Sequence, residues 1–111
     1  MKETKSLILN RNLQLWKYSP SFSRLLLLAN KENTNKDRVA LVFQGTKEIN
    51  LPTYFYCANI EWTEPNSGET KFQLISGNNT YSLIALRMDS SRDTLDYDAP
   101  VPLFEEFFDL N

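Results

Sequence analysis

Residues 70–88 read TKFQLISGNNTYSLIALRM, and this stretch decides the fold class. Two apolar runs flank a Gly-Asn-Asn segment, and both glycine and asparagine tolerate the left-handed backbone conformations that tight hairpin loops require. In the first run, Phe72 and Leu74 alternate with Lys71 and Gln73, which is the period of a strand with one face in the core. We therefore predict a β-hairpin over 75–81, between strands at 70–76 and 80–88.

The same pattern recurs along most of the chain. Short apolar runs separated by polar clusters are typical of an all-β protein, and they predict further strands at 12–18, 22–30, 38–45 and 53–62. Residues 47–51 can add a short strand, and the polar stretch 31–37 is predicted to be a loop. Residues 81–88 are apolar on both faces, which predicts a strand in the middle of a sheet that is covered on both sides.

Residues 21–30, SFSRLLLLAN, fit two structures. Ser19 and Pro20 suit the start of a helix. The apolar residues Phe22, Leu25, Leu26 and Ala29 would then share one helical side. Four adjacent leucines also fit a strand that is buried on both faces, and periodicity alone does not distinguish the two. We prefer the strand because the run is short for a helix, and the helix stays open as the alternative.

The carboxyl end, residues 99–111, reads APVPLFEEFFDLN and forms a proline-flanked acidic and aromatic tail. Beyond the prolines, Leu103, Phe104, Phe107 and Phe108 would lie on one side of a short helix or helical turn. A monomer rarely leaves an apolar surface of this size in water. We therefore expect the tail to dock on its own domain, with docking into a partner's groove as the alternative.

These patterns together predict one fold class. We expect a small single-domain all-β protein over residues 1–111, mainly antiparallel, built as a sandwich or a partly open barrel of six or seven strands. A chain of 111 residues of which 41% are hydrophobic fits one domain with a packed core.

The composition excludes several kinds of chemistry. The chain has no histidine and one cysteine, which excludes Ser-His-Asp and Cys-His nucleophile pairs, zinc sites with imidazole ligands, and an internal disulfide. Cys57 lies in the apolar run YFYCANI and is predicted to be buried and unreactive. The acidic stretch 89–98 lacks oxygen ligands where an EF-hand requires them and is interpreted as a solvated loop. We predict no cofactor and no metal site.

Charge is unevenly distributed along the chain. The net charge of −2 argues against a general nucleic-acid binder. Residues 1–38 carry eight Lys/Arg against three Asp/Glu, whereas residues 89–111 carry one against seven. Either one end is a charged docking surface or the two ends neutralise each other in the fold. With no secretory signal, no apolar run long enough for a membrane span and one unpaired thiol, we expect a cytoplasmic protein with no membrane partner.

Aromatic residues supply the candidate binding surface. Trp16 and Tyr18 lie on the predicted wet face of the strand 12–18 with Lys17 between them, where they could stack a base or a sugar or anchor a protein. The alternative is that they belong to the core. The candidate binding residues are Trp16, Lys17, Tyr18, Tyr54, Tyr56, Phe107 and Phe108.

The absence of His and Cys motifs, the acidic pI and the compact β pattern resemble small bacterial proteins of unassigned function, including immunity-type partners. No motif identifies a family. We expect a non-catalytic accessory or immunity-type domain whose partner is another protein. The alternative is a small-ligand or carbohydrate-binding domain, and a carboxylate-dependent enzyme is the third hypothesis. Paired carboxylates need a separation set by the fold, and Glu61 and Glu64 are merely near each other in the sequence. An open aromatic face favours the first, and a concave apolar cavity with convergent polar groups favours the second.

Overall fold

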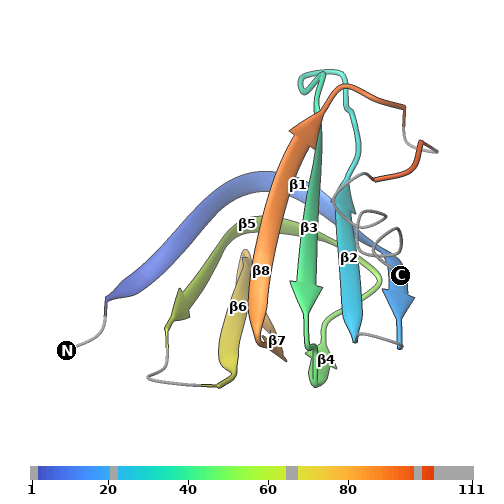
Figure 1. The fold of residues 1–111 in the computed structure, drawn as a ribbon. Helices are drawn as coiled ribbons and strands as arrows, with labels where there is room; N and C mark the ends of the chain where they lie inside the picture. The colour runs from blue at the N-terminus through green and yellow to red at the C-terminus, as the bar shows by residue number, and fades with distance from the viewer. Residues whose placement is uncertain (1–2, 21–22, 65–67, 97–98, 102–111) are drawn as a thin grey trace.

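The computed structural model describes residues 3–20, 23–64, 68–96 and 99–101. In these ranges the chain forms eight antiparallel strands and no helix (Figure 1). The strands are β1 (Thr4–Ser19), β2 (Arg24–Ala29), β3 (Arg38–Gln44), β4 (Glu48–Asn50), β5 (Tyr54–Thr63), β6 (Thr70–Ser76), β7 (Asn79–Ala85) and β8 (Arg87–Asp93). They build one open sheet in the order β4-β7-β6-β5-β1-β2-β3-β8, which confirms the predicted all-β, mainly antiparallel domain.

The sheet folds over on itself because β1 is long and bent. β1 pairs with β5 along most of its length, whereas β2 pairs with its carboxyl-terminal part, residues 14–19. Register shifts lie between Ile8 and Arg11 on one side and between Leu15 and Lys17 on the other, and Asn10 has a φ of 52°. Such bulges bend a strand and increase its twist. Figure 1 shows β1 as a long curved ribbon, with β2, β3 and β8 standing side by side.

The main core lies between the two halves of the folded sheet. Phe43 of β3 meets Phe72 of β6 with ring centroids 5.3 Å apart, and Phe55 of β5 meets Tyr81 of β7 at 5.2 Å. The inward-facing residues of β2 and β3 join the same buried cluster as those of β1, β5, β6 and β7. Burial of this apolar surface is the main favourable contribution to folding.

A corner joins the two ends of the sheet. β3 continues into β4 and β7 continues into β8, while β3 pairs with β8 and β4 pairs with β7. The backbone N–H of Leu86 donates to the carbonyl of Gln44, and that of Lys47 donates to the carbonyl of Ile84, each at 2.8 Å. Gly45 turns this corner with a φ of 65°, and a Cβ there would meet Leu86 at 2.5 Å. The corner therefore needs glycine at position 45.

The expected six or seven strands are too few because the predicted strand 80–88 is two strands, β7 and β8, separated at Leu86. The first strand is also longer than expected, since it begins at Thr4 rather than at residue 12. The interpretation of 89–98 as a loop is wrong for its first part, because β8 continues to Asp93. Asp and Ser disfavour strands, but pairing with β3 along the whole of β8 overrides that preference.

Of the two segments predicted as strands buried on both faces, 21–30 is confirmed over Arg24–Ala29 and 81–88 is not. β7 lies next to the end of the sheet between β6 and β4, so the expectation of a central strand at 81–88 is wrong. Leu83 and Ala85 are buried, but Ile84 is half-buried and Leu86 is 56% exposed. All six residues of β2 are buried, as are the first six of β3. The segment Arg24–Ala29 is therefore a strand, and the helix alternative is wrong there.

Other expectations are confirmed. β6 and β7 form the predicted hairpin, in which Ser76 pairs with Asn79 and Gly77 has a φ of 58°. β4 lies within 47–51, and residues 31–37 connect β2 to β3 without a strand or helix. The predicted helical turn and docking of the tail concern residues 102–111, which lie outside the described residues.

Candidate functional site

Tyr54 and Tyr56 lie on the outer face of β5, away from the core. They alternate with the buried Phe55 and Cys57, and their side chains are 61% and 46% exposed. Alternate residues of a strand share a face about 7 Å apart, so the two rings lie side by side. The Tyr56 hydroxyl donates to the Asn10 side-chain oxygen at 3.1 Å, which orients its ring.

Residues of β1 extend this surface. The register places Gln14 opposite Tyr54 and Asn12 opposite Tyr56, so their amide side chains border the two rings. Ile8 is 69% exposed and also faces outward, because its neighbour Leu7 packs against the core. We call Ile8, Asn12, Gln14, Tyr54 and Tyr56 the β1–β5 outer face.

The β1–β5 outer face is open rather than deeply concave. A shallow hollow of about 160 Å³ lies beside Tyr54, lined by Asn12, Gln14, Leu28, Asn30, Lys31 and Glu32. The Asn12 amide donates to the Glu32 carboxylate at 3.3 Å, so the loop after β2 forms one wall of the hollow. Drug-sized ligands occupy pockets of roughly 300–1,000 Å³, so this surface suits a protuberance of a larger partner.

Trp16 and Tyr18, which were predicted to share a face of β1, lie on opposite faces because of a bulge between Leu15 and Lys17. Sequence alternation places Trp16 and Tyr18 on one face, but the register shift sets Lys17 opposite Leu26 and Tyr18 opposite Leu25. Leu25 belongs to the main core cluster, whereas Leu26 faces outward. Trp16 is half-buried against the outward-facing cluster, and Tyr18 is 46% exposed at the end of the strand. Phe107 and Phe108 lie outside the described residues.

A second concave region lies where β6 begins and β7 passes into β8, at the end of these strands away from the Gly77 turn. A cavity of about 300 Å³ is lined by Trp62, Glu64, Gly68, Thr70, Phe72, Leu86, Arg87 and Met88. The rings of Trp62 and Phe72 lie 5.5 Å apart. Its size is at the lower end for small-ligand sites, and it combines aromatic walls with a carboxylate and a guanidinium. No sequence pattern singled it out.

The outer face of β2 and β3 carries a second buried cluster. Leu26, Leu28, Ala40 and Val42 point away from the main core and pack with Val101 and half-buried Trp16. Arg24 lies on this face of β2 because it is two residues before Leu26, and every second residue of a strand shares a face. Arg38 lies on the same face of β3, two residues before Ala40. We call Arg24, Leu26, Leu28, Arg38, Ala40 and Val42 the β2–β3 outer face.

Arg38 anchors the segment after β8 to the β2–β3 outer face. Its guanidinium donates to both carboxylate oxygens of Asp93, at 2.9 and 3.0 Å. It also donates to the backbone carbonyls of Asp96 (3.1 Å), Ala99 (2.7 Å) and Pro100 (3.2 Å). These hydrogen bonds hold the pKa of Asp93 below its ordinary value, with Arg38 as the main cause. The arginine is 1% exposed, and its hydrogen bonds offset its burial.

Other charged side chains also pair within the fold. Arg11 is buried and donates to Asp37 at 3.2 Å, and Arg92 donates to the same carboxylate at 2.8 Å. These bonds, from Arg92 above all, lower the pKa of Asp37. Lys31 lies 3.5 Å from Asp96. Lys31–Asp96 and Arg38–Asp93 thus join basic groups of the first third to acidic groups of the last part. Arg11–Asp37 lies within the first third, and Arg92–Asp37 joins the two parts with the signs reversed.

The described residues offer little for nucleophilic or metal chemistry. Cys57 is buried, and burial raises the pKa of its thiol to about 11, so it is protonated at neutral pH, in line with the predicted unreactive thiol. The carboxylate of Glu64 pairs with Lys5 at 2.8 Å, and that of Glu61 accepts a hydrogen bond from Asn59 at 3.2 Å. In the described ranges, no group of three or more His, Cys, Asp or Glu side chains is arranged to hold a metal ion.

Comparisons with known proteins add no assignment. No family model, curated protein or solved structure matches this chain. Within the part of the chain that the structure describes, no helix is long and apolar enough to cross a membrane. The function therefore has to be argued from the surfaces themselves.

Proposed function

We propose that this chain is a non-catalytic domain that binds another protein through the β1–β5 outer face. The observation that carries the proposal is the pair of exposed rings of Tyr54 and Tyr56 on one face of β5, with the exposed side chain of Ile8 farther along the outward side of the paired strand β1. Single exposed apolar residues are ordinary, but a group rimmed by amides is typical of an interaction surface. Tyrosine is enriched at such surfaces because its rigid ring is apolar and its hydroxyl can form hydrogen bonds.

The geometry of the face supports a macromolecular partner over a small ligand. The hollow beside Tyr54 is small, and its lining includes the amides of Asn12 and Gln14 together with Lys31 and Glu32. These groups supply hydrogen-bond donors and acceptors around an apolar centre, which is the usual anatomy of a protein interface. Carboxylate and ammonium groups beside one another also argue against a surface for nucleic acid, which needs net positive charge.

The test compares two tyrosine variants in partner capture. Tagged wild-type protein, Tyr54→Ala/Tyr56→Ala and Tyr18→Ala are used to capture proteins from the source cells, followed by quantitative mass spectrometry. Tyr18 is the matched control, because it is as exposed as Tyr56 but lies on another part of the sheet. We expect the double variant to lose the partner, since an anchor residue contributes about 2 kcal/mol, or roughly 30-fold in Kd. A folded double variant that captures the same proteins in the same amounts contradicts the proposal.

The cavity near Trp62 supports a second candidate, a small-ligand or carbohydrate-binding domain. Its aromatic walls and the flanking Glu64 and Arg87 are the groups that would orient a ligand with an apolar face and polar edges. Titration of a sugar and metabolite panel, followed by the Trp62 indole signal, distinguishes this candidate. A ligand that shifts the Trp62 signal and leaves the Tyr54 and Tyr56 rings unaffected would favour it.

A further inference from the structure

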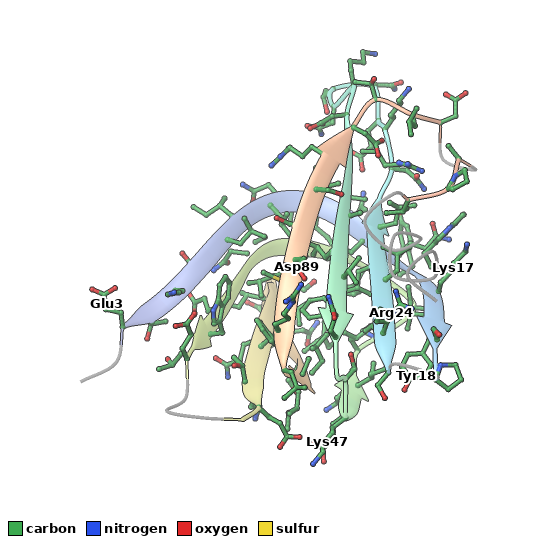
Figure 2. The ribbon with its side chains drawn as sticks, in the orientation of Figure 1. Glu3, Lys17, Tyr18, Arg24, Lys47 and Asp89 are labelled. Carbon is green, nitrogen blue, oxygen red and sulfur yellow. The ribbon has the colours of Figure 1, made fainter. Side chains whose placement is uncertain are left out.

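The open sheet leaves a cavity between two of its strand edges. Among the described strands, β8 pairs with β3 alone, and the amino-terminal part of β1 pairs with β5 alone, because β2 joins β1 only from Gln14 onward. In Figure 2, β8, where Asp89 is labelled, crosses in front of the arch of β1, which begins beside Glu3. A cavity of about 300 Å³ lies between them, and we call it the β1–β8 cavity. Its lining residues are Leu7, Leu9, Val39, Ser90, Ser91 and Arg92.

The floor of the β1–β8 cavity is apolar, and its β8 side is polar. Leu9 and Val39 belong to the main core cluster, and Leu7 packs against it. Arg92 lies opposite Val39 in the β3–β8 register, and directly opposed residues of antiparallel strands share a face. Arg92 therefore lies on the side of β8 that faces the core, as does Ser90 two residues before it. An apolar floor beside a hydroxyl and a guanidinium suits a ligand with one apolar end and one polar end.

The polar side of the cavity carries positive charge. Arg92 donates to one oxygen of the Asp37 carboxylate at 2.8 Å, and buried Arg11 donates to the other at 3.2 Å. Two guanidinium groups thus share one carboxylate, and the three groups together carry a net positive charge. Arg92 has several N–H donors and a side chain that is 59% exposed, so an anion in the cavity can bind it while Asp37 stays in place. A carboxylate matches the planar guanidinium best, because two parallel hydrogen bonds can form.

We propose that the β1–β8 cavity binds a small amphiphilic carboxylate, of the size of a fatty acid with about eight carbons. The alkyl chain lies on Leu7, Leu9 and Val39, and the carboxylate accepts hydrogen bonds from Arg92 and from the Ser90 hydroxyl. The volume sets the size of the ligand, because it is at the lower end of the roughly 300–1,000 Å³ range of ligand pockets. This site is separate from the β1–β5 outer face and from the cavity near Trp62, so it does not depend on the proposed function.

The first test titrates the full-length protein with sodium octanoate, followed by calorimetry and by the methyl NMR signals of Leu7, Leu9 and Val39. We expect these signals to shift, and the Trp62 indole signal to stay in place. Affinity should rise about four-fold for each CH₂ from butanoate to octanoate, since each CH₂ leaves water. Octan-1-ol should bind roughly ten-fold more weakly than octanoate, because it has no charged group for Arg92. Unshifted methyl signals, or equal affinity for the alcohol and the carboxylate, overturn the proposal.

A matched pair of variants tests the guanidinium. Arg92→Gln should weaken octanoate binding roughly ten-fold and leave octan-1-ol binding unchanged, which also shows that the cavity is intact. Arg87→Gln is the control, because Arg87 lies on the same strand, pairs with Asp89 and has a side chain that is 60% exposed, but lines the cavity near Trp62. Octanoate affinity that is equal in Arg92→Gln and wild type, or that falls in Arg87→Gln instead, overturns the proposal.

A third variant fills the cavity. Ser90 is exposed at the edge of the sheet, so a larger side chain there can be accommodated without disturbing the core. Ser90→Phe should abolish the binding of both octanoate and octan-1-ol, because its ring occupies the space of the alkyl chain. A folded Ser90→Phe protein that binds octanoate as tightly as wild type also overturns the proposal.

Discussion

β2 and β7 resemble each other in sequence but differ in their surroundings. Both are six- or seven-residue strands with adjacent apolar residues, RLLLLA and NTYSLIA. Every side chain of β2 is buried, whereas β7 is buried at Leu83 and Ala85 and half-buried at Ile84 between them. Both strands have a strand on each side, so pairing does not explain the difference. What differs is the outer face, which in β2 packs with Val101 and Trp16. Burial on both faces therefore depends on a distant segment that returns to the sheet.

The largest effect is expected from the arginine that anchors this segment. Arg38→Met removes the donor to Asp93 and to three backbone carbonyls. Breaking a buried ion pair from one side typically costs about 3–5 kcal/mol. Water reaches the remaining carboxylate of Asp93, which is 23% exposed, so we expect the lower end of that range, together with the loss of the donor to the backbone carbonyls. Urea unfolding measures the loss of unfolding free energy. A dye that binds exposed apolar surface should bind the variant more strongly, because the outer face of β2 is then exposed as that of β7 is.

The matched control is Arg87→Met. Arg87 also pairs with an aspartate of β8, Asp89, at 2.9 Å, but its side chain is 60% exposed. Exposed ion pairs contribute at most about 1 kcal/mol because water screens them. Equal losses of unfolding free energy in the two variants would show that Arg38 is not the anchor of the returning segment.

A pair of apolar truncations tests the comparison directly. Leu28→Ala, on the outer face of β2, should cost about 2–5 kcal/mol, as a buried leucine does. Ile84→Ala, on the outer face of β7, should cost about 1 kcal/mol because its side chain is already in partial contact with water. Leu83→Ala reports the inner face of β7 and should match Leu28→Ala. If Leu28→Ala costs no more than Ile84→Ala in urea unfolding, the outer face of β2 is not a second core.

Local sequence patterns predicted most of the strands. They did not predict which strands pair, or which side chains of different strands lie on the same face of the sheet. The hairpin at Gly77 and the strand over the four leucines follow from turn chemistry and apolar runs that a few neighbouring residues determine. β8 was missed because its stability comes from pairing with β3, not from the strand preference of Asp and Ser. The prediction that Tyr18 and Trp16 share a face is wrong because the bulge after Leu15 shifts the strand by one residue and turns Tyr18 to the other face. The sequence pattern gives no indication of this bulge.

The candidate site was predicted in part for the same reason. Tyr54 and Tyr56 were named from the sequence as aromatic residues of the strand predicted at 53–62, and the structure shows that they alternate with buried Phe55 and Cys57. Asn12, Gln14 and Ile8 join them through the β1–β5 register, which pairs residues that are distant in the sequence, such as Asn12 with Tyr56. The role of Arg38 likewise requires knowing that residues 96–100 return to β3. A single arginine in an apolar run gives no indication of such a partner.

The smallest expected effect is the dependence of stability on acid pH. The pKa of Asp93 is lowered by its hydrogen bonds with Arg38, so the folded state favours the carboxylate. A carboxyl group whose pKa is lower in the folded state contributes its full stability at a pH above its ordinary pKa of 3.8. It loses that stability as the pH falls from this value through its lowered folded-state pKa. Asp37 acts in the same direction, mainly through Arg92. Because the chain has no histidine, the unfolding free energy should be nearly constant from about pH 6 to 8.

Asp93→Asn isolates this contribution and connects it to the comparison of β2 with β7. The variant should be less stable than wild type at pH 7, since Arg38 then faces a neutral amide, and the difference should shrink as the pH falls below 4. Urea unfolding at a series of pH values measures both quantities. Asp37→Asn is the control, because it removes a similarly paired carboxylate that does not contact the segment carrying Val101. If Asp93→Asn and wild type lose stability in parallel below pH 5, the ionised Asp93 does not stabilise the anchor. The hydrogen bonds from Arg38 to the backbone carbonyls of residues 96–100 would then be what holds Val101 against the outer face of β2.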